Sequence, residues 1–231
     1  IEPGDWSSDV CSSDLYIVKS ALELFLAKRS CKNVTMDEIA SELAISKRTL
    51  YEHFENKKAL ILECMNLATN DVYHKCEEMK SESKHAFDYF FRSIGVIQSG
   101  LKEVAILANE IKKVYPEIFK QIVSSHVIFA KTNTKFFFNK AKQDGFIRDD
   151  IDEQFFISMM EMNMVHSSDS EFLNKNRNFG EDNIKIKVFY TIIRGISSVK
   201  GVEYVDEVIK NKELQNTNNL QQNEKECFFK D

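Results

Sequence analysis

Apolar residues recur along most of the chain with the spacing of α-helices. In the first such segment Ile17, Ala21, Leu24 and Phe25 fall on one face, and a polar run at residues 28–30 follows. No segment alternates cleanly between apolar and polar residues as a half-buried strand does. Further helical patterns follow from Lys57 to about Lys80 and at roughly residues 84–98, 101–114, 116–143, 151–167, 181–199 and 202–212. The pattern therefore predicts an all-α fold.

Two short helices joined by a tight turn are predicted after the first helix. Thr35 and Glu38 have the spacing of a capping box, in which the Thr hydroxyl and the Glu carboxylate each accept a backbone N–H of the other residue. Ser46 is the N-cap expected for the next helix, where Leu50 and Phe54 share the inward side. Two helices joined by so short a turn form a helix-turn-helix unit.

The outward side of that last helix carries groups suited to reading DNA. Arg48, Thr49 and Glu52 face away from the predicted core, where they could meet base edges. The side chains that flank them, long enough to reach phosphates, are Lys47, Tyr51 and His53. Residues 16–60 hold eight basic and six acidic residues, a net charge of +2, so charge alone leaves open that this is an ordinary solvated face.

The stretch TMDEIASELAISKRTLYEHFENKKAL, residues 35–60, resembles the N-terminal DNA-binding domain of TetR-family transcriptional regulators, and the resemblance extends over roughly residues 16–64. It implies a ligand-responsive regulator, most often a repressor, that binds a palindromic operator in double-stranded DNA as a homodimer. Ala44 stands in the turn where the family often has Gly, and an Ala there is expected to keep a negative φ. The resemblance implies base contacts by Lys47, Arg48 and Thr49 and phosphate contacts by Thr35, Tyr51, His53 and Lys57. The N-cap residue Ser46 is a further candidate DNA contact.

Two late helices, predicted at 151–167 and 181–199, carry more apolar surface than one core can cover. TetR-like proteins dimerise through such helices, and the alternative is a fully buried helix pair in a monomer. The stripes assigned to the dimer interface are Phe156, Met160 and Met164 on the first helix and Phe189, Ile193 and Ile196 on the second. The stripes left for the core are Phe155, Met159, Met162 and His166, and Val188, Ile192 and Val199.

The middle of the chain is rich in aromatic residues, which the resemblance associates with a pocket for a small apolar or amphipathic effector. Aromatic residues at helical spacing also fit an ordinary core, and that alternative stays open. The candidate ligand residues are Phe90, Phe91, Ile94, His126, Phe129 and Met159.

The composition of the chain argues against several other classes of protein. The 231 residues are 43% hydrophobic with only 7 Gly and 2 Pro, which favours a helical globular protein, and no apolar run is long enough to span a membrane. The five cysteines are widely spread without a C-x-x-C pair, so a reducing cytoplasm is expected and no metal or other cofactor is indicated. No nucleophile-base pair or Gly-rich phosphate loop points to an enzyme. The alternative function is a helical protein-interaction module without sequence-specific DNA binding.

The chain divides, on this evidence, into four parts. Residues 1–15 are acidic, Ser-rich and without helical period, so they are expected to be a non-native leader derived from an adapter sequence, with a native acidic leader as the alternative. Residues 16–60 form the helix-turn-helix domain and 61–212 the helical ligand-binding and dimerisation domain. Residues 213–231 form a polar tail that is expected to be disordered.

Overall fold

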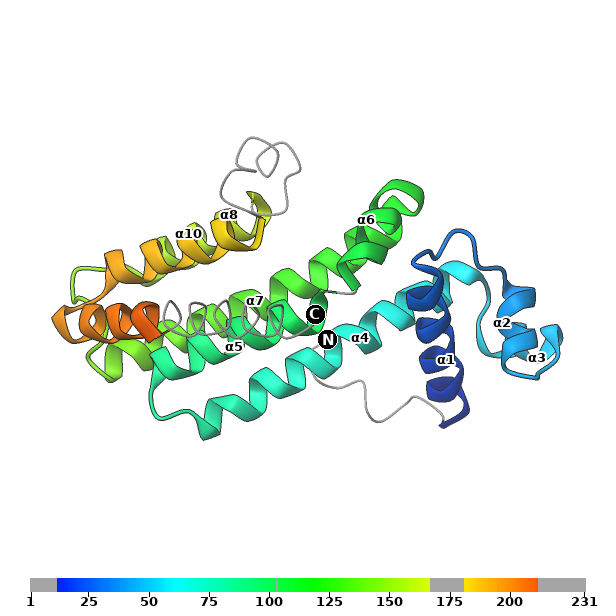
Figure 1. The fold of residues 1–231 in the computed structure, drawn as a ribbon, viewed down its shortest axis with the longest axis horizontal. Helices are drawn as coiled ribbons and strands as arrows, with labels where there is room; N and C mark the ends of the chain where they lie inside the picture. Colours follow the sequence, from blue (N-terminus) through cyan, green and yellow to red (C-terminus); the bar gives the residue numbers. More distant parts are fainter. Residues whose placement is uncertain (1–11, 103, 167–180, 212–231) are drawn as a thin grey trace, which may run out of the picture. The chain divides into compact units, whose positions relative to one another are not determined.

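The computed structural model describes residues 12–102, 104–166 and 181–211. Within these ranges the chain is helical (Figure 1), and the only β pairing is one isolated antiparallel bridge between Ile147 and Ser197. The all-α prediction is confirmed. The helices are α1 (Ser12–Lys28), α2 (Met36–Glu42), α3 (Lys47–His53), α4 (Lys57–Glu82), α5 (Ala86–Leu101), α6 (Val104–Val114), α7 (Pro116–Gln143), α8 (Glu153–His166) and α10 (Glu181–Ile196), with a further helical segment at 199–211.

The N-terminal ends of α2 and α3 are fixed by the caps that the sequence predicts. The Thr35 hydroxyl accepts the Glu38 N–H at 3.1 Å, while the Glu38 carboxylate accepts the Thr35 N–H at 2.8 Å. The Ser46 hydroxyl accepts the Thr49 N–H at 3.0 Å. These bonds satisfy N–H groups that the first turn of a helix leaves without partners, so the two helices begin where their caps stand.

The helices α1, α2 and α7 are each followed, within two positions, by a residue in the left-handed conformation. These residues are Arg29 (φ 52°), Ala44 (φ 52°) and Gly145 (φ 72°). In the turn after α2 the Ile45 N–H bonds back to the Ala40 carbonyl at 3.0 Å, the long-range bond of a Schellman motif. The expectation of a negative φ at Ala44 is wrong, because this bond forms only when the residue before Ile45 is left-handed.

Of the described residues, the first of two compact units contains 12–84, 88–102 and 104–133. Its core is formed by apolar side chains of α1, α2, α3 and α4 together with α6 and the beginning of α7. Leu60 and Ile61 of α4 and Leu107 and Ile111 of α6 belong to this same core. The unit therefore extends well past residue 60, where the sequence places a domain boundary, because the helix-turn-helix helices have too little apolar surface to form a core alone.

The second unit comprises residues 85–87 and 134–231, and its described part is built on aromatic side chains. The Phe87 ring centroid lies 5.6 Å from that of Phe137 and 4.9 Å from that of Phe146. Phe138 stacks on Phe156 at 5.4 Å. These are ordinary distances for packed aromatic pairs, so this group of aromatic residues forms core.

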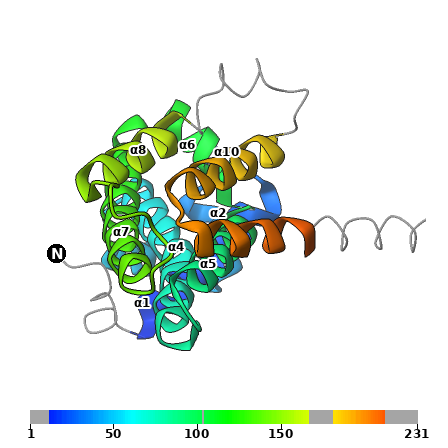
Figure 2. The same cartoon turned by 90° about the vertical axis from the view of Figure 1, so that its left-hand side faces the viewer.

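Both α8 and α10 belong to this second unit, where they lie next to each other in two perpendicular views (Figures 1 and 2). The stripe assigned to a dimer interface is the inward one: the side chains buried within the single chain are Phe156, Met160, Ile193 and Ile196. Phe189 is half-buried, and the side chain of Met164 lies outside the described residues. Of the other stripe, Phe155, Met162 and Val199 are exposed by 64%, 58% and 79%, whereas Met159, Val188 and Ile192 are half-buried. The assignment of the four buried residues to a dimer interface is therefore wrong; two apolar stripes repeat with the same helical period, so the sequence does not tell which one the chain itself covers.

Candidate DNA-binding interface

The helix α3 is held by one apolar edge, and its other side is free. Leu50 is completely buried and Phe54 nearly so, in a core that also contains Ile39 and Leu43 of the preceding helix and turn. Because α3 is only two turns long, this anchoring fixes its rotation. The side chains of Lys47, Arg48, Tyr51 and Glu52 are exposed as a result.

Arg48 is the most prominent group of this surface. Its side chain is 89% exposed, and its Nε donates to Glu52 Oε1 at 3.0 Å, a contact between residues four apart on the helix. This contact leaves the two terminal nitrogens of the guanidinium for another partner. A fork of this kind can donate to O6 and N7 of a guanine at once, so Arg48 has the geometry of a base-reading group.

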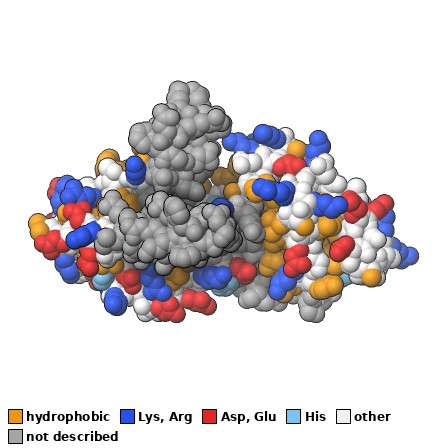
Figure 3. Space-filling model, in the orientation of Figure 1, with side chains coloured by type: hydrophobic (Ala, Val, Ile, Leu, Met, Phe, Trp, Pro, Cys, Tyr) orange, Lys and Arg blue, Asp and Glu red, His pale blue; other side chains and the backbone are white. Residues whose placement is uncertain are grey.

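Lys47 is held by a contact that the sequence did not reveal. Its Nζ lies 2.7 Å from a carboxylate oxygen of Asp37 on α2, and this hydrogen bond raises the pKa of Lys47. Figure 3 shows acidic and basic side chains interspersed at the right-hand end, where Figure 1 places α2 and α3. Two cations of this surface are thus paired with carboxylates of the same surface.

The hydroxyl-bearing candidates have different surroundings. The Thr49 hydroxyl lies 2.8 Å from the Ser46 hydroxyl, so these two predicted DNA contacts stabilise the start of α3 together. Thr35 likewise serves the capping box of α2. Tyr51 is exposed, and its ring extends from the same side of α3 as Lys47 and Arg48.

Two predicted phosphate contacts are engaged within the chain. His53 Nδ1 lies 2.5 Å from Asp14 Oδ1 on α1. Asp14 belongs to the 1–15 segment expected to be foreign, whose last four residues are the first residues of α1, while residues 1–11 lie outside the described residues. Lys57 Nζ donates to the Lys32 carbonyl at 2.9 Å, and partial burial lowers the pKa of Lys57.

The predicted effector residues are brought together only in part. Phe129 stacks on Tyr73 with ring centroids 3.6 Å apart, and the Tyr73 hydroxyl shares a hydrogen bond with Nδ1 of His126. Burial lowers the pKa of His126, which keeps its ring neutral near pH 7. Tyr73, on α4, has the spacing of a core position and no signal in the sequence that distinguishes it.

Further polar groups surround the same place. Tyr89 donates to Asn133 Oδ1 at 2.6 Å, and the Asn133 amide donates to the Phe129 carbonyl at 3.0 Å. Phe90 is buried beside the half-buried Phe91, with ring centroids 5.4 Å apart. Of the remaining two candidates, Ile94 is half-buried on α5, and the half-buried Met159 belongs to α8 in the second unit.

Comparison with known proteins identifies the domain that contains α2 and α3. Residues 17–64 match the model described as "Bacterial regulatory proteins, tetR family". This segment belongs to the TetR family of DNA-binding domains. The matched residues include α2 and α3, so the arrangement described above is that of a TetR DNA-binding domain. No match was found among curated protein sequences.

Solved structures of regulators share the fold over most of their length. A transcriptional regulator from Cytophaga hutchinsonii has a TM-score of 0.65 at 14% identity, with 81% of this chain and 100% of that chain covered. A TetR-family regulator from Marinobacter aquaeolei has a TM-score of 0.61 at 20% identity, with 87% of this chain and 98% of that chain covered. A γ-butyrolactone receptor has a TM-score of 0.55 at 17% identity, with 83% of this chain and 92% of that chain covered. Among the helices that the structure describes, none has the length and apolar character needed to cross a membrane.

Proposed function

We propose that this chain is a TetR-family transcriptional repressor that binds a palindromic operator as a homodimer and releases it when a small apolar or amphipathic effector binds. It acts in the cytoplasm, where bacterial DNA is accessible, and has no catalytic activity. The observation that carries the proposal is the anchored α3, which buries Leu50 and presents Arg48 with a free guanidinium fork. Neighbouring cations and the Tyr51 ring can contact the phosphates on either side of a major groove.

Dimerisation is proposed through α8 and α10, next to exposed apolar side chains of α8 and of the helical segment at 199–211. Phe155 and Met162 of α8 and Val199 are large apolar side chains that a single chain leaves in contact with water. A second copy could cover them by forming a four-helix arrangement. Two copies related by a two-fold axis would present two α3 helices to successive major grooves, about 34 Å apart.

The effector is proposed to bind near Tyr73, His126 and Phe129. This cluster combines a stacked aromatic pair with hydroxyl and imidazole groups in a mostly apolar setting, as small-molecule sites do. The γ-butyrolactone receptor among the similar folds supports a small effector in general terms. Effector binding would favour one of two dimer conformations and so change the affinity for DNA.

The first test is fluorescence anisotropy with labelled duplexes from the region upstream of the gene that encodes this chain. Wild type, Arg48→Ala, Tyr51→Ala and the matched control Lys120→Ala are compared from 50 to 300 mM salt. Lys120 is an exposed cation on α7. We expect each of the two α3 variants to weaken specific binding by about 1–3 kcal/mol, and the control to bind as wild type does.

Binding must also weaken steeply with salt, because phosphate contacts release counterions. If the wild-type chain binds no duplex at low salt, the protein-interaction module becomes the better account. Binding that the α3 variants retain in full would place the DNA contact elsewhere on the chain.

The dimer surface is tested by sedimentation equilibrium of wild type, Phe155→Glu and the control Ile128→Glu. Both positions are exposed, so neither change should unfold the chain. We expect the wild type and the control to be dimers and Phe155→Glu to dissociate at least about tenfold more readily, since a buried carboxylate is costly. A dimer unaffected by Phe155→Glu would refute this choice of surface.

A further inference from the structure

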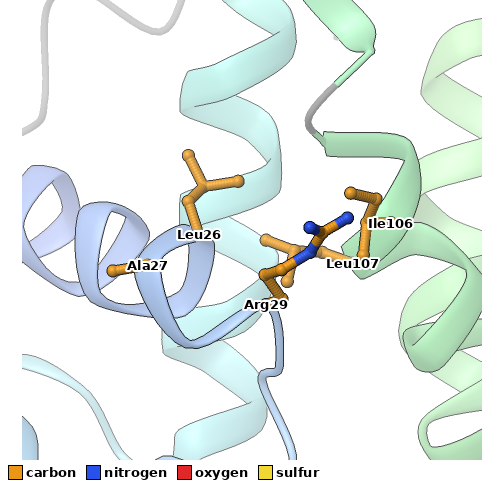
Figure 4. A pocket seen from close by; sticks show the side chains of 5 residues that line it. All are labelled: Leu26, Ala27, Arg29, Ile106 and Leu107. Carbon is orange, nitrogen blue, oxygen red and sulfur yellow. The ribbon is translucent and has the colours of Figure 1, made fainter.

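A cavity of about 430 Å³ lies between the end of α1 and α6 (Figure 4). None of the residues that line it belongs to the cluster of Tyr73, His126 and Phe129. Its lining residues are Leu26, Ala27, Arg29, Ile106 and Leu107. All five belong to the first compact unit. A cavity of this size lies within the range of small-molecule sites, so it can hold one short-chain compound.

Arg29 gives this cavity a single positive charge. Its side chain is exposed, and in the described part of the chain it has neither a hydrogen bond nor an ion pair. Figure 4 shows its guanidinium directed toward Ile106 and Leu107 on α6. Arg29 is also the left-handed residue that follows the last residue of α1, with a φ of 52°. Gly is the usual residue at this position, and any other side chain there costs roughly 1 kcal/mol.

The opposite wall of the cavity is apolar and partly open to water. Ile106 is 40% exposed, whereas Leu107 is buried beneath it. The acidic residue within α6 is Glu110, one turn on from these two residues. Its carboxylate accepts the Ser30 hydroxyl and the backbone N–H groups of Cys31 and Lys32, so its negative charge is already shared among three donors.

A guanidinium over an apolar wall selects a particular kind of molecule. A carboxylate can accept two parallel N–H bonds from the guanidinium fork, and an attached alkyl chain can cover the exposed part of Ile106. We propose that this cavity binds a free amphipathic carboxylate with a short alkyl chain. It is a second small-molecule site, separate from the effector cluster of the proposed function. Because it lies against the helix that leads into the helix-turn-helix, a bound carboxylate would contact both α1 and α6.

The test is isothermal titration calorimetry of the full chain with sodium octanoate, compared with 1-octanol. Arg29→Gln removes the charge, and Lys32→Gln is the matched control, because Lys32 is an exposed cation three residues further on. Ile106→Glu places a carboxylate at the cavity without touching the buried core. We expect octanoate to bind the wild type and the control alike, and to bind both other variants at least about tenfold more weakly, as loss of a bidentate pair implies. Octanol should bind the wild type at least about tenfold more weakly than octanoate does.

Three results would overturn the proposal: no binding of octanoate to the wild type, equal binding by Arg29→Gln, or equal affinity for octanol. Vesicles of phosphatidylglycerol provide a further arm, since they also present an anion beside alkyl chains. Arg29-dependent binding to vesicles without binding of free octanoate would assign the cavity to a lipid surface instead. Circular dichroism of each variant shows whether it is folded. DNA binding is not read in this experiment, so its outcome is independent of the proposed repressor function.

Discussion

The carboxylate of Glu110, on α6, accepts the backbone N–H of Cys31 at 2.6 Å, across 79 positions of sequence. The same oxygen accepts the Lys32 N–H at 2.9 Å, and the other oxygen accepts the Ser30 hydroxyl at 2.7 Å. Partial burial alone would raise the pKa of Glu110, but these three bonds outweigh it and the pKa is lowered. One side chain of α6 therefore holds the loop between α1 and α2.

Replacing Glu110 by Ala should lower the free energy of unfolding by about 1–3 kcal/mol, because two backbone N–H groups and a hydroxyl lose a charged acceptor. Urea denaturation at pH 7 measures the loss. Glu110→Gln keeps an acceptor oxygen without the charge, and it should recover part of the stability. An alanine variant as stable as the wild type would show that water replaces the carboxylate without cost.

Asp37 and Glu52 should weaken binding to DNA of any sequence, because they form ion pairs with Lys47 and Arg48 of the α3 surface. We expect Asp37→Asn and Glu52→Gln to strengthen binding to a random duplex and to steepen its salt dependence, with each freed cation adding up to roughly one unit of slope. Anisotropy titrations over a range of salt concentrations measure both effects. Glu161→Gln on α8 is the charge-matched control. Unchanged slopes would mean that the two carboxylates leave the cations free in solution.

Ala44→Gly should stabilise the chain by about 0.5–1 kcal/mol, because Ala44 is held at a positive φ that Gly adopts without strain. The gain is reduced by the larger conformational entropy of Gly in the unfolded chain. Ala27→Gly, within α1, is the opposite control and should destabilise by a similar amount. Thermal unfolding of the two variants should therefore shift in opposite directions, and equal shifts would contradict the left-handed turn.

The stability of the chain should fall as the pH drops below about 6.5, in part because of His126. Burial lowers the pKa of His126 in the folded chain from its ordinary 6.5. Just below pH 6.5 the unfolded chain binds a proton that the folded chain does not, so protonation favours unfolding; above pH 6.5 neither state is protonated and the effect vanishes. Urea titrations of wild type and His126→Gln between pH 7.5 and 5 isolate this contribution. If both curves have the same slope below pH 6.5, His126 is not held neutral.

Cys31 and Cys64 should resist alkylation while the chain is folded. Burial raises the pKa of Cys31 to about 12 and that of Cys64 well above its ordinary range, and the thiolate is the reactive form. At pH 8 we expect iodoacetamide to modify these two residues at least about 100-fold more slowly than in 8 M urea, because each pKa unit lowers the thiolate fraction tenfold. Peptide mass spectrometry measures the rates, with glutathione in the same solution as the reference thiol. Rapid labelling without urea would point to frequent local opening.

The sequence by itself determined the features that depend on neighbouring residues. The caps at Thr35 and Ser46 bond to N–H groups three residues away, so the starts of α2 and α3 could be predicted. The outward side of α3 followed from Leu50 and Phe54 by helical geometry, and Pro116 marked the start of α7. The exposed surface of α3 was predictable for this reason: the rotation of the helix depends on a few apolar positions within two turns.

Only the tertiary structure decided the features that join distant parts of the chain. Glu110 has no local signal, since its three donors lie about 80 positions earlier. The pairing of Lys47 with Asp37 depends on how α2 and α3 pack. The choice between Phe155 and Phe156 as the outward residue of α8 was also decided there. Two apolar stripes on one helix have the same period and similar hydrophobicity, so the sequence cannot tell which is covered; that depends on where the other helices lie.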